Sequence, residues 1–149
     1  MNLLTDNLLT VVTFFPLVGA VLLLFVPNES ENSKNLARWI ALAASLVTFA
    51  LSLWMWSRFD PANAGFQFVE NYEWIGASIG YRMGVDGVSI LFVVLTALLI
   101  PACVLSSWGS ISNRVREYML VFLILETLCI GVFTALDLAM FYVFFEGSL

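Results

Sequence analysis

The stretch from Glu117 to Leu149, EYMLVFLILETLCIGVFTALDLAMFYVFFEGSL, decides the fold of this 149-residue chain. It contains two strongly apolar runs separated by a short joint at Leu136–Asp137, and each run carries one acid, Glu126 or Glu146. If both runs are membrane helices, each acid lies nine residues into its run, which is roughly 13 Å at about 1.5 Å per residue. A bilayer has a hydrocarbon core about 30 Å thick. The sequence therefore predicts two carboxyl groups near the middle of the membrane, on neighbouring antiparallel helices.

The two acids have a functional and a structural interpretation. A charge at this depth costs about 2.5–3.5 kcal/mol on insertion scales, so carboxyl groups inside a membrane usually mark a proton or ion path, or a structural pair. We expect Glu146 and Glu126 to transfer protons. Two alternatives remain open. Glu146 can form a static ion pair that sets helix packing, and Glu126 can simply bond a neighbouring Ser or Thr.

The composition indicates an integral membrane protein. Hydrophobic residues make up 61% of the chain and charged residues 11%, whereas soluble domains average about 45–50% and about 25%. The six basic residues are scattered and form no patch, which argues against nucleic-acid binding.

The residues that usually bind metals and redox groups are scarce. Histidine is absent, and the two cysteines, Cys103 and Cys129, both fall inside apolar runs. Metal and haem sites normally need histidine or clustered cysteine. We therefore expect no metal and no cofactor in this chain, and we interpret both cysteines as small packing residues.

Apolar runs divide the chain into predicted elements. The expected class is an all-α polytopic membrane protein with about five transmembrane helices, at residues 8–26, 36–57, 87–107, 118–136 and 138–149. Pro16 and Pro101 fall inside two of them and are expected to interrupt backbone hydrogen bonding. The twelve residues from Leu138 onward reach only about 18 Å, so the fifth helix is expected to be incomplete and the chain to be part of a longer protein.

The loop at residues 58–86 carries a β-hairpin pattern. Phe66, Phe68, Glu70, Tyr72 and Trp74 alternate with Gln67, Val69, Asn71 and Glu73, and alternation resumes at Ile79. Alternation interrupted by a Gly-Ala-Ser break is typical of two antiparallel strands. Asp86 followed by Ser89 then marks the start of the next helix.

The distribution of Lys and Arg predicts an orientation in the membrane. Lys34 and Arg38 follow the first predicted helix, and Arg114 and Arg116 follow the third. The long loop has two basic residues and also several acids. Because short cytoplasmic loops carry an excess of basic residues, we expect the N-terminus and the hairpin outside.

Three sequence segments resemble one protein family. They are FFP at Phe14–Pro16, YRMGVDGVSILFVVLTALLIP from Tyr81 and ALDLAMFYVFFEGSL from Ala135. The chain is similar to the antiporter-like subunits of respiratory complex I, and among these to the N-terminal part of the type called subunit M in bacteria and subunit 4 in mitochondria.

The resemblance implies a function and specific roles. It implies a membrane-arm subunit of a proton-pumping NADH:quinone oxidoreductase, a translocase subunit without a redox site of its own, in a bacterial inner membrane with a periplasmic N-terminus and hairpin. Flavin, iron–sulfur clusters and quinone are then expected in partner subunits. Other membrane-arm subunits, including antiporter-like neighbours, and the lipid bilayer are the expected partners. Glu146 matches the glutamate that pairs with a lysine two helices later and belongs to the proton path. Asp86 and Asp137 match acidic positions near helix ends, where helix capping explains them.

Two other functions stay open on sequence alone. A subunit of a multi-subunit Na⁺/H⁺ antiporter would share similar motifs. A structural membrane scaffold would need neither glutamate for transport.

Overall fold

The computed structural model describes residues 8–26, 31–62, 65–74, 76–110 and 114–148, with the side chains at 31, 73–74 and 76–79 outside this description. The described chain has five helices and two strands. In order, they are α2 (Leu8–Leu24), α3 (Glu31–Ser57), β1 (Gln67–Trp74), β2 (Gly76–Val85), α4 (Ser89–Ser106), α5 (Val115–Thr134) and α6 (Leu138–Ser148).

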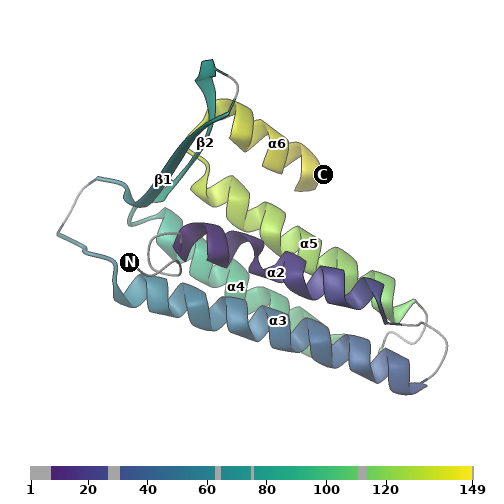
Figure 1. Ribbon diagram of the computed structural model, residues 1–149. Coiled ribbons are helices and arrows are strands. Elements are labelled where there is room, and N and C mark those ends of the chain that lie inside the picture. The colour runs from purple at the N-terminus through teal and green to yellow at the C-terminus, as the bar shows by residue number, and fades with distance from the viewer. Residues whose placement is uncertain (1–7, 27–30, 63–64, 75, 111–113, 149) are drawn as a thin grey trace.

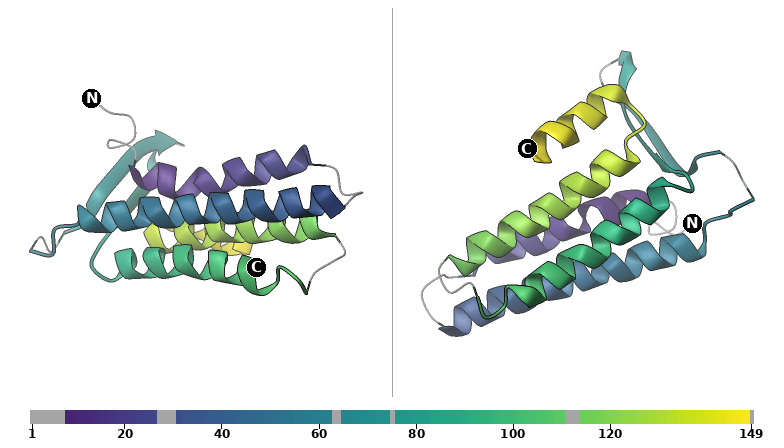
Figure 2. Two further views of the ribbon diagram at one scale, coloured as in Figure 1. Left: turned by 90° about the horizontal axis from the view of Figure 1, so that it is seen from below. Right: turned by 180° about the vertical axis from the view of Figure 1, so that it is seen from behind.

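Helices α2 to α5 lie side by side as a bundle, and α6 turns back over α5 beside the hairpin (Figures 1 and 2). Among the described residues, three helices are long and apolar enough to cross a membrane, namely α3, α4 and α5. Helices α2, with 17 residues, and α6, with 11, are apolar but shorter. The predicted class, a helical membrane protein with a small β-hairpin, is confirmed.

The helix boundaries differ from the predicted ones mainly at the start of α3. This helix begins at Glu31, whereas the sequence predicted a loop up to residue 36. Glu, Asn, Ser and Lys side chains are tolerated in helices and are well solvated beyond the bilayer. The polar residues at 31–35 therefore mark the boundary of the apolar segment of α3, but the helix continues through them.

Two apolar clusters fill the interior of the bundle. The hairpin-side cluster consists of Leu8, Leu9, Val12, Met55, Met83, Val85, Ile90, Val93, Ile130, Met140 and Phe144. The far cluster consists of Ala20, Leu23, Val26, Ala37, Ala41, Leu42, Ala44, Val104, Val115, Met119 and Leu123. Each helix from α2 to α5 contributes to both clusters, so a layer between them crosses the middle of the bundle.

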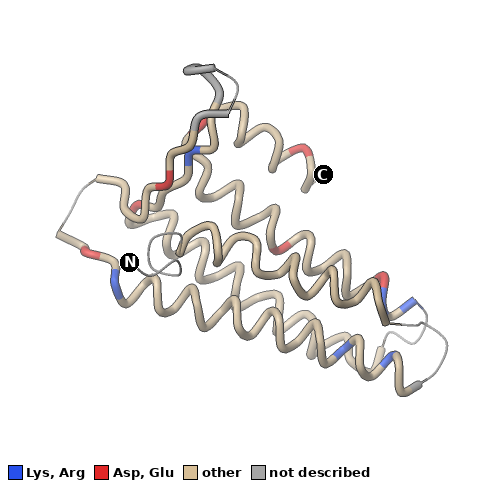
Figure 3. Tube along the Cα trace, in the orientation of Figure 1, with Lys and Arg blue, Asp and Glu red and all other residues tan. Residues whose placement is uncertain are grey.

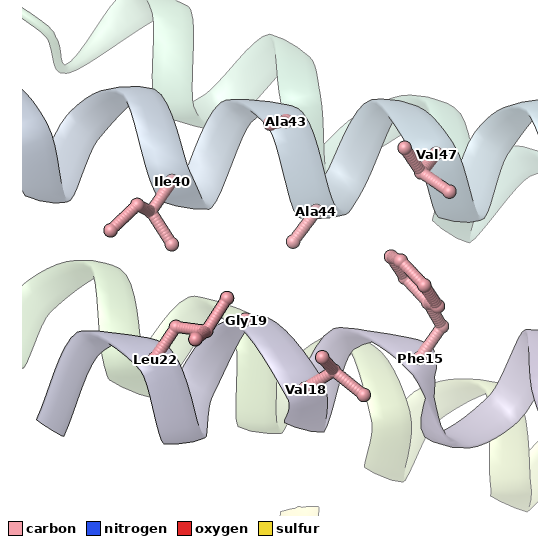
Figure 4. Close-up of a pocket in the computed structure, with 8 residues that line it drawn as sticks. All are labelled: Phe15, Val18, Gly19, Leu22, Ile40, Ala43, Ala44 and Val47. Atoms are coloured by element: carbon pink, nitrogen blue, oxygen red, sulfur yellow. The ribbon is translucent and has the colours of Figure 1, made fainter.

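Helices α2 and α3 approach closely at small residues (Figure 4). A Cβ added to Gly19 would lie 2.5 Å from the Cβ of Ala44, so only glycine fits at this crossing. Small residues allow close helix packing in membranes. The same seam leaves a shallow apolar cavity of about 210 Å³ lined by Phe15, Val18, Gly19, Leu22, Ile40, Ala43, Ala44 and Val47.

Strands β1 and β2 form the predicted antiparallel hairpin, with Tyr72 opposite Tyr81 and Asn71 opposite Arg82. The register shifts between Gln67 and Glu70, where Phe68 has a φ of 55°. Such an irregularity lets a strand twist and redirects its side chains.

Apart from Glu126 on α5 and Glu146 on α6, the charged residues lie toward the two ends of the bundle or in the hairpin region (Figure 3). The starts of α3 and α5, which carry Lys34, Arg38, Arg114 and Arg116, lie together at the end away from the hairpin. This grouping agrees with the predicted orientation, which remains a prediction.

Candidate functional site

Helix α5 places Glu126 in the centre of the bundle. Leu123 belongs to the far cluster and Ile130 to the hairpin-side cluster, so Glu126 lies in the layer between them. Its exposed fraction is 0%. Helices α2, α3 and α4 all pack against α5, which explains how a side chain halfway along this helix is completely enclosed (Figure 3).

The carboxyl group of Glu126 makes no hydrogen bond to the part of the chain that the structure describes. Neither Oε1 nor Oε2 has a partner there, and the adjacent Thr127 Oγ1 is in the same situation. An ionised carboxylate left alone in such surroundings costs several kcal/mol. Its oxygens therefore need a proton, a water molecule or a cation.

Four buried hydroxyl groups on α2 and α3, the helices that pack against α5, are already engaged. Each donates to a backbone carbonyl of its own helix. The pairs are Thr13 to Leu9, Ser45 to Leu42, Thr48 to Ala44 and Ser52 to Phe49. The alternative that Glu126 simply bonds a Ser or Thr therefore finds no support among these residues.

Two buried prolines leave carbonyl acceptors inside the bundle. Pro16 in α2 and Pro101 in α4 have no N–H, so the carbonyls of Val12 and Ala97, four residues earlier, lose their helical donors. Both Val12 and Ala97 are 0% exposed. Helices that pack on α5 thus bring carbonyls without their usual helical donor into the same interior as the Glu126 carboxyl group, and such carbonyls can accept hydrogen bonds from water.

Glu146 occupies a different position, because it is exposed on α6. Helix α6 packs on α5 through Phe144, which lies against Gly131, and through Gly147, which lies against Leu128. At about 100° per residue, Leu128 and Gly131 lie on the opposite side of α5 from Glu126. The structure therefore does not bring the two acids together, although their helices are neighbours.

A buried acid that the sequence analysis did not select joins the hairpin to α2. Glu70, 5% exposed, accepts the backbone N–H of Thr10 at 2.7 Å through Oε2 and the Thr10 hydroxyl at 2.9 Å through Oε1. Tyr81 Oη lies 2.7 Å from the same hydroxyl. Glu70 thus satisfies an amide in the first turn of α2 from a strand 60 residues away, a capping contact that no local pattern predicts.

Burial changes the acid–base properties of this cluster. It raises the pKa of Glu70, and the two hydrogen bonds from Thr10 only partly oppose the effect. Burial also raises the pKa of Tyr81 to about 12, with a further contribution from the nearby Glu70 charge.

The two acids expected at helix ends act as caps. Asp86 Oδ1 accepts the backbone N–H groups of Val88 at 3.1 Å and Ser89 at 2.8 Å at the start of α4. Asp137 Oδ1 accepts the N–H of Ala139 at 2.9 Å at the start of α6. Asp137 also forms an ion pair with Arg82, at 2.9 Å between Oδ2 and Nη1.

No group of three or more metal-ligating side chains occurs among the residues that the structure describes. Cys103 and Cys129 are free thiols of intermediate exposure in different helices. The expected absence of a cofactor remains a prediction.

Comparison with known proteins places the chain in context. No family model matches the sequence. The chain is 51% identical over 145 residues to NADH-quinone oxidoreductase subunit M of Rhodobacter capsulatus and 36% identical over 143 residues to subunit M of Rickettsia prowazekii. It is 47% identical over 135 residues to NADH-ubiquinone oxidoreductase chain 4 of Arabidopsis thaliana. These matches cover 97%, 95% and 90% of the chain.

The chain is homologous to these oxidoreductase subunits. The predicted resemblance to subunit M and subunit 4 of complex I is confirmed. The chain spans between 27% and 29% of the length of these relatives. Together with its apolar helices, this homology identifies a multi-pass membrane protein.

Proposed function

We propose that this chain belongs to a membrane-arm subunit of a proton-pumping NADH:quinone oxidoreductase and that Glu126 and Glu146 transfer the protons. The observation that carries the proposal is the carboxyl group of Glu126. It is 0% exposed in the centre of an apolar bundle, and neither oxygen bonds to a described residue. Intramembrane acids in such positions are typical of proton paths.

The proposed chemistry needs no redox group in this chain. A buried carboxyl group binds a proton when nearby positive charge leaves and releases it when that charge returns. Glu126 would hold the proton inside the bundle. Water molecules that carry the proton there could donate hydrogen bonds to the carbonyls of Val12 and Ala97. Electron transfer through flavin, iron–sulfur clusters and quinone would occur in partner subunits and would supply the energy as a change of charge.

Glu146 would exchange protons at the exposed face of α6, where it could meet a side chain that is not among the described residues. Its exposed position leaves the carboxyl group accessible to a positively charged partner, such as the lysine that the family resemblance implies. A second carboxyl group on a neighbouring helix would allow a proton to move in two shorter steps. Because the two acids lie on different sides of α5, water or another side chain would have to connect them.

The proposed location is a bacterial inner membrane with the N-terminus and hairpin on the periplasmic side. The four basic residues at the opposite end of the bundle support this orientation. The names of the relatives favour complex I over a Na⁺/H⁺ antiporter.

The test uses Glu126→Gln and Glu146→Gln in the full-length subunit within its complex. Each variant should assemble, because glutamine has nearly the same shape, but should lose most proton pumping per electron transferred. Proton uptake into membrane vesicles and NADH oxidation are measured together. Glu117→Gln is the matched control, because this acid also lies on α5 but is 43% exposed and bonded to Arg116. A normal proton-to-electron ratio in both variants would remove these acids from the path and would favour a scaffold.

A further inference from the structure

Strand β2 holds the joint between α5 and α6. The backbone N–H of Leu136 donates to the carbonyl of Arg82 at 2.8 Å, and Met83 and Ala135 form an isolated antiparallel bridge. A Cβ on Gly84 would lie 2.9 Å from Leu136 Cδ1, so side chain and strand are in close contact. The joint therefore lies alongside β2 and pairs with it through a single bridge (Figure 1).

Asp137 connects this joint to α6 and to the hairpin at the same time. One carboxylate oxygen caps α6 through Ala139. The other accepts Arg82 Nη1 at 2.9 Å and the N–H of Gly80 at 3.3 Å. The Asp137 side chain is only 6% exposed. Both oxygens are thus used, each for a different element.

Elsewhere α6 is held mainly along one side. Its seam on α5 consists of Phe144 against Gly131 and Gly147 against Leu128. On the side toward α2 and the hairpin there is a hollow of about 310 Å³ lined by Phe14, Gly80, Tyr81, Met140, Val143 and Phe144. Helix α6 could therefore rotate about its contact with α5 if Asp137, the residue just before the helix, were not held in place.

We propose that Asp137, through its ion pair with Arg82, is a positioning residue for Glu146. The two acids are on one helix, nine residues or roughly 13 Å apart. A rotation of α6 at Asp137 moves the Glu146 carboxyl group relative to any partner, and errors of about 1 Å can cost a transfer step about 100-fold. The inference rests on the proposed role of Glu146 in proton transfer.

A pH profile can distinguish positioning from simple structural support. The N–H of Ala139, the N–H of Gly80 and the Arg82 charge lower the pKa of Asp137, so this group stays ionised at working pH. Asparagine does not titrate, so a shifted profile in Asp137→Asn must come from another group. Among the described groups facing α6, β2 presents Arg82 and Tyr81, α5 presents Leu128 and Gly131, and α2 presents Phe14. On α6 itself, Tyr142 lies one turn before Glu146.

The experiment compares Asp137→Asn and Arg82→Gln in the full-length subunit within its complex. Asparagine can still cap α6 through its one side-chain oxygen, so the first variant removes the ion pair together with the hydrogen bond from the Gly80 N–H. We expect each variant to lower protons moved per electron by about twofold or more, and to shift the pH midpoint of pumping by about one unit. The pumping ratio of the double variant should fall by less than the two single losses combined, because both changes break the same ion pair.

Asp86→Asn is the matched control. Asp86 also caps a helix start, with Oδ1 accepting Val88 and Ser89, but α4 carries neither candidate acid. The same substitution there should leave the ratio and the pH midpoint unchanged.

The outcomes separate this inference from the function on which it depends. Normal pumping in Glu146→Gln would refute the role of Glu146 in transport. If Glu146→Gln fails to pump while Asp137→Asn and Arg82→Gln keep the normal ratio and pH midpoint, only the positioning role is refuted. Reduced amounts of complex with a normal ratio would also refute it. If Asp137→Asn does not assemble, Arg82→Gln decides the question from the hairpin side.

Discussion

At the scale of single residues, the buried acids of this chain differ in what surrounds them. Glu70 and Asp137 each accept at least two hydrogen bonds from neighbouring elements, which accounts for their burial. Glu126 is buried to the same degree without any described partner. Acids whose hydrogen bonds are satisfied can stabilise contacts, whereas a buried acid without partners lowers stability and is a candidate for a functional site.

The raised pKa of Glu70 predicts a pH-dependent contact between the hairpin and α2. The folded protein binds the proton of Glu70 more tightly than the unfolded chain, whose value is near the ordinary 4.5. This contribution to stability is complete below that value and is lost as the pH rises through the raised pKa. We expect the thermal midpoint of wild type to fall relative to Glu70→Gln over this window. Thermal unfolding of both proteins at a series of pH values measures the effect.

A parallel series with Asp60→Asn serves as the control, since Asp60 is an exposed acid of the same loop. If wild type and Glu70→Gln keep a constant difference across all pH values, the carboxyl group does not titrate with folding.

Residue contacts were only partly predictable from the sequence. The cap at Asp86 follows from its spacing to Ser89, whereas the cap at Asp137 is expected only from the family resemblance, and both are found. The contact of Glu70 with Thr10 joins residues 60 positions apart, so no local pattern contains it. The predicted pairing of acids across the membrane also depends on helix rotation, and periodicity in a run that is apolar all round does not define a face. Sequence could therefore assign Glu126 and Glu146 to their helices, but not the direction in which each side chain points.

At the scale of elements, the seam between α5 and α6 depends on a glycine. A Cβ on Gly131 would collide with the ring of Phe144. We expect Gly131→Ala to destabilise the protein by about 1–3 kcal/mol, because overpacking forces side chains or backbone to shift. The double variant Gly131→Ala with Phe144→Leu should recover part of the loss. Thermal unfolding of the purified proteins measures both effects.

Gly109→Ala is a suitable comparison, because no atom lies within 4 Å of the Cβ it would add. Equal stability changes at Gly109 and Gly131 would mean that the seam does not depend on the glycine.

The elements themselves follow closely from hydropathy and alternation. Apolar length predicts α4 and α5 within a few residues, and alternation predicts the hairpin. The start of α3 is less predictable, because polar residues that end a membrane segment can still continue a helix. The contact of β2 with the α5–α6 joint is a tertiary feature and has no sequence signal.

At the scale of the whole molecule, the grouping of basic residues at one end of the bundle predicts that its two ends can be labelled from opposite sides of the membrane. In a full-length protein without other cysteines, a cysteine at Asp60 should react with an impermeant maleimide in intact cells. A cysteine at Ser110 should react only after permeabilisation. Both positions are exposed, and they lie at opposite ends of the bundle. The reverse labelling pattern would place the N-terminus inside.

The hollow between α2, the hairpin and α6 has a consequence for leakage of ions. Its lining is almost entirely carbon, and Tyr81 Oη is already bonded to Thr10. Water gains few hydrogen bonds in such a space and stays out of it. The hollow therefore places an apolar lining between the polar cluster at Glu70 and helix α6, which carries Glu146. If Glu146 carries protons as proposed, they would have to reach it by a route other than this apolar hollow.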